Sequence, residues 1–221
     1  MPWRKYISAP YLKWPFWIII LVIWVTIFLS ARYNGNLRWG VIVHETGDLS
    51  WYLLAFTLFL GLARKLCPKC VTIVRILPLR KHSGVLAFLI AGSHGIAELV
   101  KNGIHRDWEA IFNYTLSFDS LVTLGMLSFL LMLPLFLTST EWAVKKMGAK
   151  TWFWLHKLAH PAFILAALHS AWVTGQLRSA SLVWLVLYVL GYIILWIKRG
   201  IEKRQKGQKI HRFDPMEEIH E

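Results

Sequence analysis

The chain has 221 residues, of which 56% are hydrophobic and only 17% are charged, and its formal net charge is +13. A soluble domain is near half apolar and about a quarter charged, so the composition excludes an ordinary soluble enzyme and indicates an integral membrane protein. Two cysteines exclude a disulfide-stabilised scaffold. Thirteen Trp, seven Tyr and twelve Phe are typical of membrane interfaces and of pockets for flat hydrophobic cofactors.

Six apolar runs predict membrane-spanning helices, because one crossing needs about 20 mostly apolar residues. In chain order they cover residues 16–31, 49–63, 83–100, 120–137, 151–173 and 181–197. The remaining residues form two short tails and five short loops, which leave no room for a soluble domain. The predicted fold is therefore an all-α integral membrane protein, a bundle of six transmembrane helices.

The basic residues indicate the orientation of this bundle, because Lys and Arg in short loops stay on the cytoplasmic side. They concentrate in the N-terminal segment, the second loop, the fourth loop and the C-terminal tail. Both termini are therefore predicted to face the cytoplasm, in a multi-pass protein of the cell (inner) membrane. We divide the chain into a cytoplasmic segment, 1–14, a transmembrane domain, 15–198, and a cytoplasmic tail, 199–221. Topology and anionic lipid then explain the basic excess, and nucleic acid is not expected as a partner.

Four histidines lie within the predicted spans, and polar residues at membrane depth indicate function by default. The third span holds His94, and the fifth holds His156, His160 and His169. Both spans start at the cytoplasmic face, so His94 and His169 can face each other at similar depth. Zinc needs three or four clustered ligands, whereas haem iron needs only one or two axial ligands. The pattern indicates a b-type haem between His94 and His169; for each of them an interhelical hydrogen bond is the alternative.

His156 precedes His169 by 13 residues, which is roughly 20 Å along a helix. The two can therefore serve two separate haems, one near each leaflet. A straight helix would place them on different faces, and a kink at Pro161 is expected to correct this. His160 is expected to satisfy the backbone that Pro161 frees, rather than to bind metal.

Three further polar residues near the ends of the third span have two interpretations each. His82 is a candidate haem ligand opposite His156, or a partner of lipid headgroup phosphate. Arg80 is a candidate partner of a haem propionate through a bidentate contact, or again of lipid headgroups. Glu98 is a candidate to orient His94 or relay a proton, or is simply an interfacial residue. The remaining histidines are expected as solvated residues of loops or tails: His44, His105, His211 and His220.

The motifs around these residues resemble a known family. They are His44-Glu-Thr-Gly47, Leu79-Arg-Lys-His-Ser-Gly84, Leu137-Thr-Ser-Thr140, Trp154-Leu-His-Lys-Leu158 and Leu168-His-Ser-Ala-Trp172. Together they are similar to the MsrQ (YedZ) family of the ferric reductase-like transmembrane superfamily, which also includes the membrane part of NADPH oxidases. The resemblance implies that His94 and His169 are the axial pair of a b-type haem. It also implies that His156 takes part in haem binding, with one or two haems in all.

The resemblance implies partners as well. MsrQ is a haem subunit that a quinol or a flavin reductase feeds with electrons, and it passes them to MsrP, a periplasmic molybdopterin enzyme that repairs methionine sulfoxide. Some members carry flavin, so FMN is a further candidate cofactor. The sequence has no G-x-G-x-x-G turn of a dinucleotide-binding domain, and a separate flavin reductase or membrane quinol is therefore the expected donor. We predict a haem-bearing electron-transfer subunit of an oxidoreductase that serves an acceptor on the outer side.

Two other functions stay open from the sequence. The first is a stand-alone ferric-type transmembrane reductase, and the second is a cofactor-free transporter or assembly protein whose histidines form a proton relay. The chain also departs from the family pattern in Cys67-Pro-Lys-Cys70, which lies in a basic loop. A C-x-x-C motif is a redox pair or half of a zinc site, and here we expect two reduced thiols.

Overall fold

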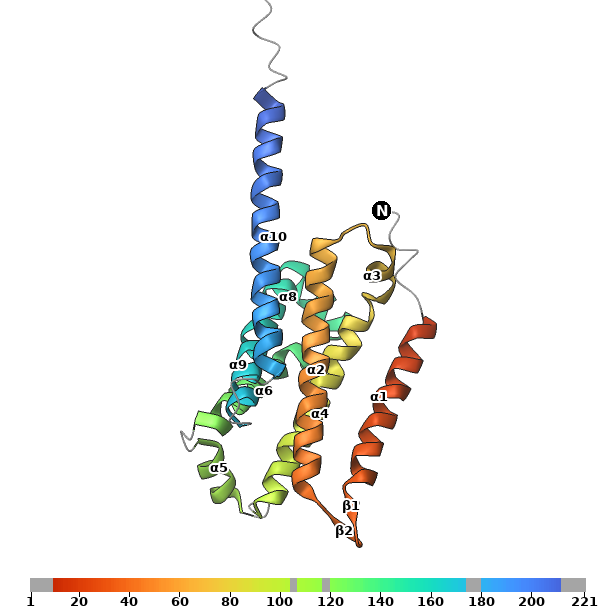
Figure 1. The fold of residues 1–221 in the computed structure, drawn as a ribbon, viewed down its shortest axis with the longest axis vertical. Helices are drawn as coiled ribbons and strands as arrows, with labels where there is room; N and C mark the ends of the chain where they lie inside the picture. Colours follow the sequence, from red (N-terminus) through yellow and green to blue (C-terminus); the bar gives the residue numbers. More distant parts are fainter. Residues whose placement is uncertain (1–9, 104–106, 117–119, 174–179, 212–221) are drawn as a thin grey trace, which may run out of the picture. The chain divides into compact units, whose positions relative to one another are not determined.

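The computed structural model describes residues 10–103, 107–116, 120–173 and 180–211. They are almost entirely helical (Figure 1). The elements are α1 (Pro10–Ser30), β1 (Arg32–Tyr33), β2 (Asn36–Leu37), α2 (Trp39–Leu66), α3 (Val71–Ile76), α4 (Leu79–Lys101), α5 (Trp108–Leu116), α6 (Ser120–Leu137), α7 (Glu141–Met147), α8 (Ala149–Leu155), the 3-10 helix η2 (His156–Leu158), α9 (Ala159–Val173) and α10 (Ala180–His211). The chain divides into two compact units, residues 1–185 and 186–221, and the site described below lies in the first.

A tight hairpin joins α1 to α2. Its strands pair antiparallel, with Arg32 opposite Leu37, and the two residues between them, Asn34 and Gly35, have φ values of 47° and 80°. An Asn-Gly pair with both φ values positive is the preferred two-residue connection of a hairpin. The hairpin therefore returns the chain directly into α2, next to α1.

Two helix pairs form the centre of the first unit. α2 packs along α4 (Figure 1), and small hydroxyl residues tie the two backbones together: Ser50 donates to the carbonyl of Ala87 at 2.9 Å, and Ser83 donates to that of Leu53 at 2.7 Å. α6 packs along α9, where Ser128 donates to the carbonyl of Ala162 at 2.8 Å. Small residues with interhelical hydrogen bonds are the usual way to bring membrane helices close together.

Stacked aromatic rings join these two pairs. Trp51 of α2 stacks on Phe163 of α9, with ring centres 4.6 Å apart. Phe88 of α4 stacks on Phe129 and Phe136 of α6, at 4.6 Å and 4.5 Å. Trp51, Phe88 and Phe163 are all buried, so these rings fill the core between the pairs and hold α4 and α9 within the same bundle.

Four described helices are long and apolar enough to cross a membrane: α1, α2, α4 and α10. α6 and α7 together meet the same criteria, but they are bent by 86°, so counting them as one span gives up to five. This supports a transmembrane helical bundle, whereas the count of six spans and the orientation of the termini stay predictions.

The expected fifth span is not one continuous helix. It is divided into α8, η2 and α9, and the break at His156–Leu158 comes just before Pro161. Proline lacks the N–H that would bond to the carbonyl four residues earlier, which here belongs to Lys157 in the middle of η2. The sequence thus predicted Pro161 as the cause of the break. The structure places the break itself about one helical turn before the proline.

Two other boundaries also differ from the sequence prediction. α2 begins at Trp39, ten residues before the expected start of the second span, because polar residues of its first turns are compatible with a helix end outside the apolar layer. His44 is therefore helical and not in a loop, although its side chain is exposed as expected. The long outer loop contains the helix α5. His105 and His220 lie outside the described residues.

Candidate functional site

His94 and His169 come together in the first unit. Their ring centres are 6.3 Å apart, and the ring planes are nearly perpendicular, at 81°. His94 lies in α4 and His169 in α9, so the pair joins the two helix pairs at one point. The prediction that these two residues face each other is borne out by this contact.

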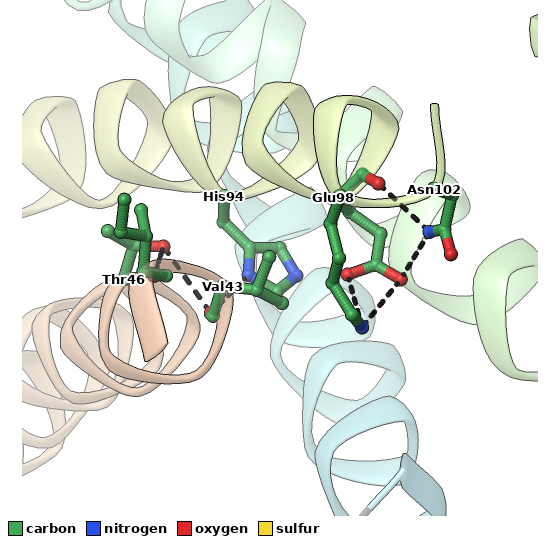
Figure 2. A network of polar contacts seen from close by, with 7 residues as sticks. Val43, Thr46, His94, Glu98 and Asn102 are labelled. Atoms are coloured by element: carbon green, nitrogen blue, oxygen red, sulfur yellow. Dashed lines mark hydrogen bonds and ion pairs between the residues drawn. The ribbon is translucent and has the colours of Figure 1, made fainter. Parts of the chain in front are cut away.

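A backbone carbonyl holds the imidazole of His94 in place. Its Nδ1 lies 2.8 Å from the carbonyl oxygen of Val43 on α2, as Figure 2 shows. A carbonyl only accepts hydrogen bonds, so Nδ1 carries the proton and Nε2 of the neutral ring keeps its lone pair. An N–H to a carbonyl on one ring nitrogen, with a lone pair on the other, is the usual arrangement of a metal-binding histidine.

Two glycines allow the helices to approach these rings closely. A Cβ added at Gly47 of α2 would lie 3.0 Å from Nδ1 of His94, and one added at Gly125 of α6 would lie 3.0–3.2 Å from Cε1, Nδ1 and Nε2 of His169. These distances are shorter than an ordinary contact, so any side chain at either position would press on the ring. Both imidazoles thus pack directly against helix backbone, at positions that carry no side chain.

The small residues beside His94 divide into two kinds. A Cβ at Gly92 would touch the ring of Phe129 at 3.8 Å, so Gly92 faces the packed interface with α6. A Cβ at Gly95 would meet nothing within 4 Å. Gly95 is therefore exposed on α4, whereas Gly92 serves helix packing.

Glu98 belongs to a polar network at the end of α4 (Figure 2). Its carboxylate accepts a hydrogen bond from Nδ2 of Asn102 at 2.9 Å and pairs with Nζ of Lys101 at 3.3 Å. These partners stand at the helix terminus and are exposed. The contacts favour the interfacial interpretation of Glu98.

His156 lies at the break of the expected fifth span, in a second cluster. The indole of Trp152 stacks on its ring with centres 3.9 Å apart, and Nε1 of Trp152 donates to the carbonyl of Thr138 at 2.9 Å. The hydroxyl of Thr138 lies 3.2 Å from Nε2 of His156 and donates its one proton to the carbonyl of Pro134 at 2.6 Å. Thr138 must therefore accept from Nε2–H, which leaves the lone pair of the neutral His156 ring on Nδ1.

Arg80 lies close to this second cluster. Its guanidinium packs on the backbone of α2, where a Cβ at Gly61 would lie 3.0 Å from both Cζ and Nη1. Arg80 is also within electrostatic reach of His156 and of His160. A cation and an imidazole thus lie near each other, more than three helical turns along η2 and α9 from His169.

His82, in contrast, is turned toward α1. Nε1 of Trp17 donates to Nδ1 of His82 at 3.0 Å, so the proton of the neutral His82 ring is on Nε2 and neither nitrogen offers a free lone pair. Arg80 and His82 are two residues apart, or about 200° around a helix. Arg80 is thus within electrostatic reach of His156, whereas His82 hydrogen-bonds to α1, which corrects the expectation that His82 faces His156.

Several residues of these two clusters were not singled out from the sequence. Val43 acts through its backbone carbonyl, and this role has no sequence signal. Trp51 is buried, and its Nε1 has no hydrogen-bond partner among the residues that the structure describes. Gly47 and Thr138 were present only as letters of the family motifs, and those motifs were the signal that could have found them.

The chain is similar to known proteins of one family. Residues 46–167 match the model of the ferric reductase-like transmembrane component. The protein-methionine-sulfoxide reductase heme-binding subunit MsrQ of Xanthomonas axonopodis pv. citri is 32% identical over 158 residues, which are 71% of this chain and 69% of that protein. The subunit of the same name from Ralstonia nicotianae is 27% identical over 83% of this chain and 85% of its own length. That of Herminiimonas arsenicoxydans is 30% identical, and the match spans only 58% of its length. No solved structure matches the chain.

The chain belongs to the MsrQ family of ferric reductase-like transmembrane components. The segment shared with the ferric reductase-like model contains Gly47, His94, Thr138 and His156, and it ends two residues before His169. Most of both clusters thus lies within the part that defines the family. The resemblance noted from the motifs is confirmed by these matches.

Proposed function

We propose that this MsrQ family member is a haem-bearing membrane electron-transfer subunit, in which His94 and His169 are the axial ligands of a b-type haem. The observation that carries the proposal is the distance of 6.3 Å between their ring centres. The relatives are named as heme-binding subunits, which supports the same cofactor.

The two histidines fit such a metal atom in distance, and His94 also fits it in protonation. A metal–imidazole nitrogen bond is about 2.0–2.1 Å long, so two imidazoles on opposite sides of one metal atom have ring centres roughly 6 Å apart. The observed separation agrees with this value. The bond from His94 to the Val43 carbonyl leaves Nε2 available as the ligand atom, as ligation requires.

The surroundings of the pair also suit a large flat group. Gly47 and Gly125 let the two imidazoles pack directly against helix backbone. Trp51 is one helical turn from Gly47, and its buried, unpartnered N–H is a donor that a bound acceptor group can satisfy. When bound, the haem supplies a one-electron couple with no open ligand position, which favours electron transfer over oxygen chemistry.

We extend the proposal to a second haem at His156. Arg80 is then the cation for a propionate, as its position near His156 supports, and Trp152 and Thr138 position the imidazole. His156 and His169 are 13 residues apart, or roughly 20 Å along helical backbone. One cofactor near each side of the membrane is the arrangement that a transmembrane electron path needs. FMN is an additional cofactor of the proposal, as in some members of the family.

The partners of the proposal follow from the same arrangement. A separate flavin reductase or membrane quinol supplies electrons on the cytoplasmic side, where the basic loops and both termini lie. An oxidoreductase such as MsrP accepts them outside the inner membrane. The relatives' names, which place them in a protein-methionine-sulfoxide reductase, support this acceptor over a ferric chelate.

Purified full-length protein from haem-replete cells tests the proposal. The reduced-minus-oxidised spectrum of the wild type should show a b-type haem, and His94→Ala or His169→Ala should each remove the signal of the haem that this pair binds. His160→Ala and His44→Ala serve as controls and should retain it, because His44 is exposed on α2 and His160 is expected to serve the backbone. A colourless wild-type protein, or loss of the signal at His160 with retention at His169, would contradict the proposal.

A further inference from the structure

The turn of Cys67, Pro68, Lys69 and Cys70 lies between α2 and α3 and has no part in the proposed function. Cys67 is the C-cap of α2 and Cys70 is the N-cap of α3. Both cysteines are exposed and neither is in a disulfide. The structure thus presents a C-x-x-C pair at the surface.

The geometry of this turn suits a disulfide between its own two cysteines. The N–H of Cys70 donates to the carbonyl of Cys67 at 3.2 Å, which closes a β-turn. Such a turn keeps its first and last Cα atoms within about 7 Å, close to the separation that a disulfide spans. Pro68 occupies the second position, where its fixed φ pre-forms the turn.

The flanking helices hold the turn in place. The guanidinium of Arg64 donates to the carbonyl of Pro68. The N–H of Cys67 donates to the carbonyl of Ala63 at 2.8 Å, and the N–H of Val74 donates to that of Cys70 at 3.1 Å. Because the backbone is already ordered on both sides, a disulfide here would lose little further conformational entropy.

We infer that Cys67 and Cys70 form a thiol–disulfide exchange site whose oxidant is a small anionic disulfide such as oxidised glutathione. One cysteine thiolate attacks the disulfide, forms a mixed disulfide and releases one glutathione thiolate. The second cysteine thiolate then attacks the cysteine sulfur of that mixed disulfide and displaces the other glutathione. The two cysteines together lose two electrons and two protons, and oxidised glutathione becomes two thiols.

The charge around the turn supports an anionic reactant. Arg64, Lys65 and Lys69 lie within three residues of a cysteine, and no acidic residue occurs between positions 49 and 97. A cluster of one charge sign raises the local concentration of a reactant of the opposite sign. Attack at this turn should therefore be faster with oxidised glutathione than with a neutral or cationic disulfide, and the difference should shrink at high salt.

The site can be titrated in full-length protein in detergent micelles. Samples are equilibrated in glutathione buffers of graded redox ratio, quenched with acid, alkylated and analysed by mass spectrometry. The expected product is a loss of two mass units within the peptide that carries both cysteines. In Cys70→Ser a single glutathione adduct on Cys67 should accumulate instead. Pro68→Gly, which loosens the turn, should lower the equilibrium constant for the disulfide by about two- to fivefold.

Three outcomes would overturn the inference. One is two independent glutathione adducts in the wild type, another is a disulfide between two copies on a non-reducing gel, and the third is stoichiometric zinc that protects both thiols. In the described part of the chain, no group of three or more His, Cys, Asp or Glu is placed to hold a metal. The haem spectrum of the same samples tests the proposed function separately, so failure of the thiol–disulfide proposal does not contradict the haem proposal.

Discussion

Gly125→Ala tests most directly whether haem affinity depends on the position of the His169 imidazole. The new Cβ would lie 3.0 Å from Cε1, 3.1 Å from Nδ1 and 3.2 Å from Nε2 of that ring. Carbon contacts are optimal at about 3.5–4.0 Å, so the ring must move by roughly half an ångström. Overpacking of this kind costs about 1–3 kcal/mol, which corresponds to a haem affinity weaker by about 5- to 150-fold.

The assay is a haem titration of ligand-free protein in detergent, followed by the absorption band of the bound haem. Gly95→Ala is the matched control, because it adds the same methyl group beside His94 but meets nothing within 4 Å, and its affinity should equal that of the wild type. Gly47→Ala repeats the perturbation on the other ring, 3.0 Å from Nδ1 of His94. Equal affinities for Gly125→Ala, Gly47→Ala and Gly95→Ala, in folded proteins of similar thermal midpoint, would refute the reasoning.

Three further substitutions have defined outcomes. Thr138→Val removes the acceptor of His156 Nε2–H. The spectrum or reduction potential of a haem at His156 should change, and that of the haem at the His94 pair should not. Equal changes at both haems would contradict the division into two clusters. Trp51→Phe removes a buried donor that has no partner among the described residues, so haem affinity should decrease because the proposed cofactor loses this hydrogen bond, and an unchanged affinity would contradict that role. Ser128→Ala removes the bond to the Ala162 carbonyl and should lower the free energy of unfolding by about 1 kcal/mol, measurable by denaturant titration; no loss would show that the bond does not stabilise the pairing of α6 with α9.

The sequence alone was sufficient for the class of protein and for the principal pair of histidines. Hydropathy is a local property of each segment, so the apolar runs predicted α4 and α6 to within about a turn of their ends, whereas α2 begins ten residues before its predicted start and α10 ends fourteen residues after its predicted end. Ionisable residues within such runs are rare enough to draw attention to His94 and His169. The resemblance carried by the family motifs then added the predicted cofactor and the predicted partners.

Relative rotation and close approach of the helices were decided only by the tertiary structure. Arg80 and His82 differ by two positions in the chain, yet one lies near His156 and the other bonds to Trp17 of α1; which face meets which neighbour depends on contacts between segments far apart in sequence. The break of the fifth span at η2 has the same origin, since a proline permits a kink but the packing around it fixes where the helix yields.

The roles of Val43, Gly47 and Gly125 are the clearest examples of what sequence cannot supply. A backbone carbonyl has no side-chain signature, and a glycine in a helix is read equally well as a packing residue, as Gly92 is. Each acquires its function only when α2 or α6 brings bare backbone against an imidazole on another helix. The residue types proposed to bind haem were therefore determined by the sequence, and the packing of four helices, α2, α4, α6 and α9, decided how they are held.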